Sequence, residues 1–106
     1  MTPAQLLIAL YDKMILELNK AIIFIDEKDI PKAHNSLTRA GEIVDALDAH
    51  LKVKYEISDN LATLYQYFRE KILEANMKKN AELIKEILPM IQQIRDAFEE
   101  AGKIAK

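Results

Sequence analysis

Four stretches of this chain repeat apolar residues at alternating spacings of four and three, and short polar breaks separate the stretches. The pattern is clearest in the second stretch, whose apolar series is Ala33, Leu37, Ala40, Val44, Leu47 and Leu51. This spacing places all of the series on one face of an α-helix, like the seam of a coiled coil. Because the 106 residues include only two glycines and three prolines, little of the chain is free to form loops. We therefore predict an all-α protein.

The breaks divide the chain into helices of about residues 3–26, 30–54, 59–79 and 81–103. Long helices joined by a few residues pack antiparallel to their neighbours in sequence. A chain of this length suits one hydrophobic core. We therefore predict a single domain over residues 1–106, folded as an antiparallel up-down-up-down four-helix bundle.

Helix ends carry recognisable signals. Thr2-Pro3-Ala4-Gln5 matches a capping box with proline at the first helical position. Asp29, Ser58 and Asn80 are the expected caps of the second, third and fourth helices. Pro89 falls inside the fourth apolar pattern, where we expect it to bend the helix and not to end it.

The first helix holds more apolar residues than one face can bury. Sixteen of the 24 residues from Pro3 to Asp26 are apolar, whereas a core-facing helix uses roughly three positions in seven. A second set lies off the core stripe: Ile8, Ile15, Leu16, Ile23 and Phe24. Either this helix is central in the fold, or part of its surface contacts a partner.

Composition excludes several classes of function. The net charge is -2 with the signs interspersed, so no basic stripe is available for nucleic acid. The chain has no cysteine, which removes disulfides and thiolate metal sites. No apolar run approaches the roughly 20 residues that span a bilayer, and no signal-peptide pattern precedes the first helix. We expect a soluble cytoplasmic protein without a membrane contact.

Catalytic and metal-binding patterns are missing from the sequence. His34 and His50 are sixteen residues apart, about 24 Å along a helix, and neither belongs to a metal-binding pattern. No nucleophile, general base or phosphate-binding loop can be assembled. We therefore predict no catalytic, cofactor-binding or metal-binding residues, and no enzyme. Phosphotransfer through His34 is kept as a minor alternative.

Aromatic residues gather on the third helix. Tyr65 and Phe68 fit its apolar seam, while Leu64 and Tyr67 flank that seam. Tyrosines at the edge of a bundle can bury the ring and hydrate the hydroxyl. Alternatively, these side chains line a groove that receives an apolar segment of a partner.

The chain resembles the flagellin export chaperones, the FliS family, in short motifs that follow one another in order. These are Thr2-Pro3 with Leu6-Leu7 and Leu10-Tyr11-Asp12, Asp29-Ile30 with Ala33 and Leu37, Ala40 with Ile43 and Leu47, Ile57-Ser58-Asp59-Asn60-Leu61, Leu64-Tyr65-Gln66-Tyr67, Leu73-Glu74-Ala75-Asn76 with Lys78-Lys79, Glu86 with Leu88, and Ile94-Arg95-Asp96. The resemblance covers nearly the whole chain, although each motif alone is short.

This resemblance implies a cytoplasmic chaperone of bacterial flagellum assembly. Such proteins bind the disordered C-terminal region of flagellin, prevent its premature polymerisation and deliver it to the flagellar type III export apparatus. The client wraps around the helical bundle and inserts apolar side chains into surface grooves. No cofactor is implied, and a homodimer through the same groove is expected when no client is present.

We assign client binding to nine residues on the first three helices, with the expectation that some of them belong to the core. They are Leu10, Tyr11, Ile43, Leu47, Leu61, Leu64, Tyr65, Tyr67 and Phe68.

The chain also departs from the family pattern. Members usually carry an N-terminal stretch that lies over the client groove, whereas only Met1 precedes Thr2, so either this cover is missing or the sequence begins within a longer chain. Lys13 and Leu16 replace a glycine and an arginine that are common in the family. The alternative to flagellin binding is an adaptor or dimerisation module that binds the helix of another protein.

Overall fold

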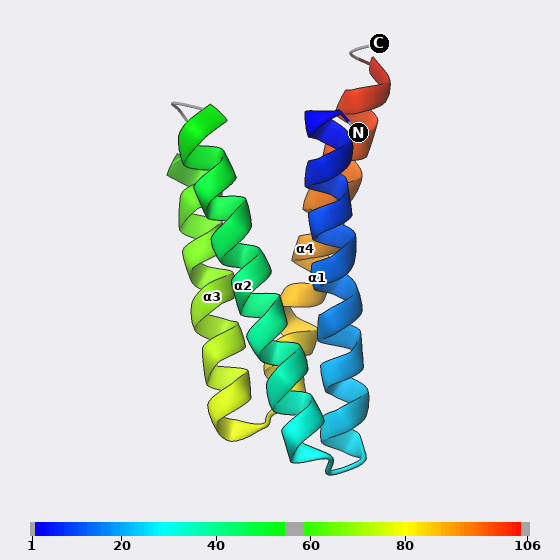
Figure 1. The fold of residues 1–106 in the computed structure, drawn as a ribbon, viewed down its shortest axis with the longest axis vertical. Coiled ribbons are helices and arrows are strands. Elements are labelled where there is room, and N and C mark those ends of the chain that lie inside the picture. The colour runs from blue at the N-terminus through cyan, green and yellow to red at the C-terminus, as the bar shows by residue number, and fades with distance from the viewer. Residues whose placement is uncertain (1, 55–58, 105–106) are drawn as a thin grey trace.

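The computed structural model describes residues 2–54 and 59–104, and these form a bundle of four α-helices (Figure 1). The helices are α1 (Pro3–Asp26), α2 (Ile30–Lys54), α3 (Asp59–Lys78) and α4 (Ala81–Ile104). The predicted all-α class is confirmed, and each predicted boundary falls within one residue of the observed one.

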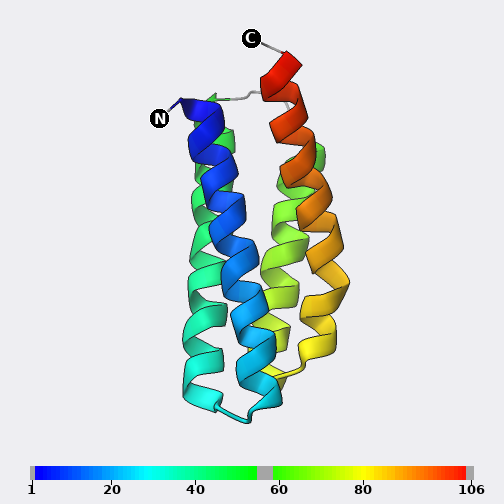
Figure 2. The same cartoon turned by 90° about the vertical axis from the view of Figure 1, so that its right-hand side faces the viewer.

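Figure 2 shows that neighbouring helices run in opposite directions. The α1–α2 and α3–α4 turns lie together at one end, which we call the closed end. The start of α1, the end of α2, the start of α3 and the end of α4 lie at the other, which we call the open end.

The predicted caps Thr2, Asp29 and Asn80 are present, and Ser58 lies outside the described residues. The Thr2 hydroxyl accepts from the backbone N–H of Gln5 (3.1 Å), and the Gln5 side chain accepts in return from the N–H of Thr2 (2.8 Å). Asp29 Oδ1 accepts from the backbone N–H of Lys32 (3.3 Å), and Asn80 Oδ1 accepts from a backbone N–H in the first turn of α4 (3.0 Å). α4 continues past Pro89 to Ile104, so the proline does not end it.

Both turns at the closed end use a lysine in the left-handed region. Lys28 has φ 60° and Lys79 has φ 51°. After α1, Lys28 donates its backbone N–H to Ile25 (3.0 Å) and Asp29 donates its own to Phe24 (2.8 Å). This is the Schellman arrangement, in which glycine is the commonest residue at the left-handed position.

The core residues change in size from one end of the bundle to the other. Near the closed end each helix contributes a buried alanine: Ala21, Ala33, Ala75 and Ala81. Towards the open end the core holds larger side chains, including Leu7, Tyr11, Leu47, Leu51 and Tyr65. Small residues allow close helix approach, whereas large ones hold helices apart. Accordingly, the α1–α4 pair and the α2–α3 pair diverge towards the open end (Figure 1).

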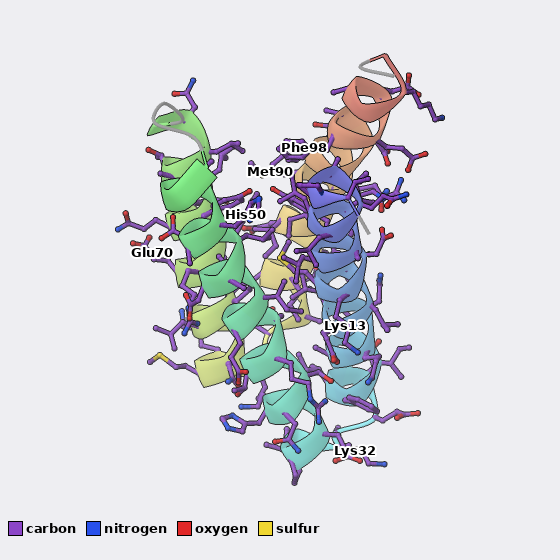
Figure 3. The ribbon with its side chains drawn as sticks, turned by 45° about the horizontal axis from the view of Figure 1, so that its top comes forward. Lys13, Lys32, His50, Glu70, Met90 and Phe98 are labelled. Atoms are coloured by element: carbon purple, nitrogen blue, oxygen red, sulfur yellow. The ribbon has the colours of Figure 1, made fainter. Side chains whose placement is uncertain are left out.

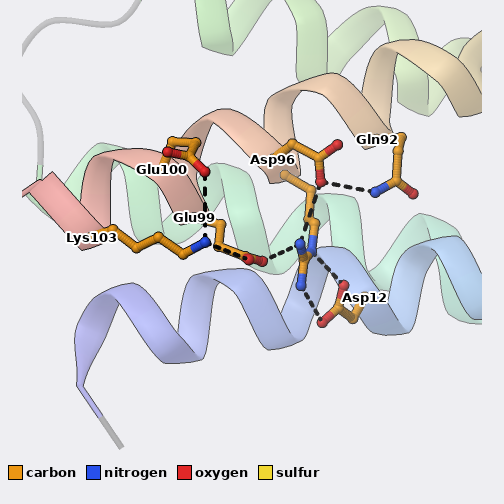
Figure 4. Close-up of polar contacts among 7 residues, drawn as sticks. Asp12, Gln92, Asp96, Glu99, Glu100 and Lys103 are labelled. Carbon is orange, nitrogen blue, oxygen red and sulfur yellow. Dashed lines mark hydrogen bonds and ion pairs between the residues drawn. The ribbon is translucent and has the colours of Figure 1, made fainter.

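An ion pair joins each helix to both of its neighbours in the bundle. The four pairs are Glu17–Arg39 (3.8 Å), Asp45–Arg69 (3.1 Å), Lys71–Glu86 (3.4 Å) and Asp12–Arg95 (2.8 Å). The last is the most elaborate, because Arg95 also contacts Asp96 and Glu99 on its own helix (Figure 4). The pairs Asp45–Arg69, Lys71–Glu86 and Asp12–Arg95 involve partly or fully exposed side chains and add little stability. In the fourth pair, the carboxylate of Glu17 is buried.

The apolar surplus of α1 is divided between the core and the surface. Ile15 and Ile22 are half-buried and pack against the core. Leu16 and Ile23 remain exposed at 50% and 53%. Part of the apolar surplus is therefore covered by the bundle itself, without a partner.

Candidate functional site

The candidate site is an apolar cavity at the open end. Its volume is about 90 Å³, and all four helices contribute to its lining: Leu7, Leu47, His50, Leu51, Leu61, Tyr65 and Phe98. Figure 3 shows His50 and Phe98 on opposite sides of the space between the diverging helix pairs. An engineered apolar cavity of about 150 Å³ holds benzene, so a cavity of this size suits one aliphatic side chain.

A pair of tyrosines spans the bundle next to the cavity. The hydroxyl groups of Tyr11 on α1 and Tyr65 on α3 share a hydrogen bond of 2.6 Å. The Tyr11 ring also lies 5.8 Å from the ring of Phe98 on α4, centroid to centroid. Because α1 and α3 are diagonal in the bundle, this bond ties together the two pairs that diverge.

Both phenols are held in the neutral form. Burial raises the pKa of Tyr11 far above its ordinary value, and the bond to Tyr65 raises it further. Burial also raises the pKa of Tyr65, an effect that the bond from Tyr11 reduces and the charge of Asp48 increases. Each hydroxyl satisfies the other, so a polar pair is tolerated inside an apolar core.

Four of the nine residues assigned to client binding lie in the core. Tyr11, Leu47, Tyr65 and Phe68 are buried. Leu47 and Tyr65 still line the cavity, whereas Tyr11 and Phe68 do not, which agrees with the expectation that some of the nine belong to the core. Both occupy seam positions, where helix spacing directs a side chain into the bundle whatever its polarity.

The other five assigned residues are half-buried and pack against the edge of the core: Leu10, Ile43, Leu61, Leu64 and Tyr67. They do not form one cluster. Only Leu61 lines the cavity, while Leu10 and Ile43 follow the seam between α1 and α2 by helical spacing.

Tyr67 and Leu64 belong to the side of α3 that faces α4. Tyr67 lies beneath the ammonium group of Lys71 (5.8 Å to the ring centroid), and Lys71 in turn pairs with Glu86 of α4. Leu64 precedes Tyr67 by three residues and so shares this side of the helix. An apolar edge therefore runs from the cavity along the α3–α4 seam.

The sequence did not assign four lining residues of the cavity to binding: Leu7, His50, Leu51 and Phe98. Leu7, Leu51 and Phe98 fit the apolar seams of their helices and look like ordinary core residues. Their position in the turns nearest the open end is the signal that could have identified them.

Within residues 2–54 and 59–104, no group of three or more histidine, cysteine, aspartate or glutamate side chains could hold a metal ion. His34 is exposed, and its Nδ1 lies 3.2 Å from the amide oxygen of Asn76. No helix in the described part of the chain is long and apolar enough to cross a membrane.

Known proteins resemble this chain over nearly its whole length. The family model "Flagellar protein FliS" matches residues 1–105. The flagellar secretion chaperone FliS of Salmonella typhimurium is 30% identical over 102 residues, covering 93% of this chain and 76% of its own length. The FliS protein of Bacillus subtilis is 25% identical over 100 residues, covering 94% of this chain and 75% of its own length. The chain therefore belongs to the FliS family of flagellar secretion chaperones.

Proposed function

We propose that this protein is a cytoplasmic chaperone that binds the disordered C-terminal region of flagellin, prevents its premature polymerisation and supports its export by the flagellar type III apparatus. The observation that carries the proposal is the apolar cavity at the open end, together with the half-buried apolar edges that lead away from it. No catalytic step and no cofactor is part of this function.

The contact surface that we propose consists of the half-buried residues Leu10, Ile43, Leu61, Leu64 and Tyr67, together with the cavity that Leu47 and Tyr65 help to line. Tyr11 and Phe68 support this surface from within the core. One aliphatic side chain of the client fills the cavity, and neighbouring client residues cover the edges.

A surface that binds a disordered client must provide a long contact area. A client that is disordered when free loses conformational entropy as it orders, so a single cavity cannot hold it. Apolar edges along the α1–α2 and α3–α4 seams add contact area on both sides of the open end. A client covered in this way no longer exposes the apolar positions through which its copies assemble.

The test replaces Leu64 with aspartate and measures binding of a peptide from the C-terminal region of the host's flagellin by calorimetry. Leu64→Asp places a charge on the apolar edge, so we expect binding to be lost at tens of micromolar. The matched control is Leu73→Asp on the same helix, because Leu73 is 53% exposed and does not line the cavity. This control should bind like the wild type.

Circular dichroism verifies that both variants keep the fold, and gel filtration reports whether copies associate through the groove. If the wild-type protein is folded and monomeric but does not bind the peptide, flagellin is not its client. If Leu64→Asp binds normally, the α3–α4 edge is not part of the contact.

A further inference from the structure

A second hollow lies between α1 and α2, at a distance from the cavity of the open end. Its volume is about 200 Å³, and its lining is polar and basic: Lys20, Phe24, Lys32, Asn35, Ser36 and Arg39. It shares no lining residue with the apolar cavity. Lys32 marks its place near the closed end (Figure 3).

Positive charge gathers at this hollow around one buried carboxylate. Glu17 is 1% exposed and pairs with Lys13 (3.4 Å), Lys20 (3.4 Å) and Arg39 (3.8 Å). Burial pushes the pKa of Glu17 up, but Lys20 and Lys13 lower it by more, so Glu17 is ionised at neutral pH. Of these three partners, Lys20 and Arg39 line the hollow and Lys13 does not, so two positive side chains face one carboxylate there, a local excess of one.

The remaining charges near the hollow do not cancel this excess. Lys32 pairs with Asp29 at 3.7 Å, so that pair is neutral as a whole. Lys32 also lies over the ring of Phe24, 5.8 Å from its centroid. The chain as a whole carries -2, so the hollow is positive on a molecule that is negative overall.

A buried hydroxyl is the second sign of a ligand. Ser36 is fully buried and lines the hollow, and its Oγ, like Oε1 of Glu17, has no hydrogen-bond partner among the described residues. A buried hydroxyl without a partner is destabilising by about 1–3 kcal/mol. An anion in the hollow would accept this O–H and face Lys20 and Arg39 at the same time.

We infer that this hollow binds a carboxylate of the polypeptide client. The inference rests on the proposed function and adds the chemistry of a second contact. The client is favoured as the source of the anion because the hollow continues into an apolar edge: Ile43 follows Arg39 by one helical turn, on the seam that leads to the open end. A peptide lying along that seam can place an acidic side chain in the hollow and apolar side chains beyond it.

The geometry also restricts the client sequence. Arg39 at the hollow and Leu51 at the cavity are separated by twelve residues of α2, about 18 Å along the helix axis. The acidic residue and the apolar residue of the client should therefore be about five or six positions apart in an extended segment, or about twelve in a helical one.

The experiment measures binding of the flagellin C-terminal peptide to Arg39→Gln and to Ser36→Ala at low and high salt. We expect Kd to rise by about three- to tenfold for each variant at low salt. The Arg39→Gln variant should also show a weaker dependence of Kd on salt. The matched control is Lys85→Gln, an exposed lysine on α4 that pairs with Glu82, and its Kd should stay within about twofold of the wild type.

A second arm replaces each acidic residue of the peptide in turn by its amide. One replacement should weaken binding to the wild-type protein and have no further effect on Arg39→Gln. Unchanged Kd for both protein variants, with binding still lost in Leu64→Asp, overturns this inference and leaves the proposed function standing. Absence of binding to the wild-type protein overturns the proposed function itself.

Discussion

Glu17 depends on the positive side chains around it for its place in the core. The buried carboxylate has a pKa below its ordinary value because Lys20 and Lys13 outweigh the effect of burial. Its unfolded pKa is about 4.3. A lowered folded pKa means that the stabilisation is present above pH 4.3 and is lost as the pH falls through the folded pKa.

Because the pKa of Glu17 is lowered in the folded protein, the substitution Glu17→Gln is informative. The substitution should lower the free energy of unfolding by about 1–3 kcal/mol at pH 7, because a buried charge-assisted contact is removed. The difference from the wild type should shrink as the pH falls below about 4. Urea unfolding at a series of pH values measures both effects.

Glu74→Gln is the control for this prediction. Glu74 also has a lowered pKa, through its partner Lys78, but its side chain is 41% exposed. Replacing it should leave the free energy of unfolding close to that of the wild type at every pH, because exposed ion pairs contribute little. Equal pH dependence in the two variants would contradict the assignment of the effect to burial.

The core seams were easier to predict from the sequence than the surroundings of individual candidate binding residues. The spacing of Tyr11 and Tyr65 indicated the core seam, whereas their polarity and the family resemblance indicated a surface. The structure resolves this conflict through a long-range contact, because the two hydroxyl groups bond to each other across the bundle. No local pattern in the sequence reveals a partner 54 residues away.

At the scale of the elements, helix boundaries were predictable because their determinants are local. The capping box at Thr2 and the cap at Asn80 act within a few residues, and the seam of α2 is buried at every predicted position. The left-handed lysines were not predicted, because no glycine marks the two turns.

Lys28 offers a test of the energetics of one turn. Its φ of 60° is unfavourable for a residue with a Cβ atom. Lys28→Gly removes that atom at the left-handed position and should raise the free energy of unfolding by up to about 1 kcal/mol.

Lys28→Ala keeps the Cβ atom and serves as the control for this substitution. It should give no such gain in chemical denaturation. A similar gain in both variants would point to the loss of the lysine charge and not to the backbone.

At the scale of the whole molecule, the core changes from alanines near the closed end to large side chains near the open end. This change predicts unequal local stability along the bundle. Hydrogen exchange of backbone amides should be slowest near the closed end, around residues 18–22 and 72–75, where helices pack closely. It should be faster around residues 47–51 and 61–65, which line the cavity, because fewer buried contacts oppose local opening there. Mass spectrometry of exchange at neutral pH measures this gradient.

Adding the flagellin peptide extends the same measurement. Exchange should slow at the open end and around the hollow that Ser36 and Arg39 line, and change little at the α3–α4 turn, because a ligand protects the part of the structure that it holds in the folded form. Uniform protection along all four helices without peptide would contradict the link between the size of the core residues and local stability.

The position of the alanines also bears on the order in which the chain folds. Each of the two short turns joins antiparallel helices whose nearest buried residues are alanines, so the first contacts after each turn are local in sequence and sterically easy. Contacts between residues close in sequence form early because little chain entropy is lost in closing them. We expect the two hairpins to assemble from their turns towards the opposite end, which makes the apolar cavity the last part of the molecule to form.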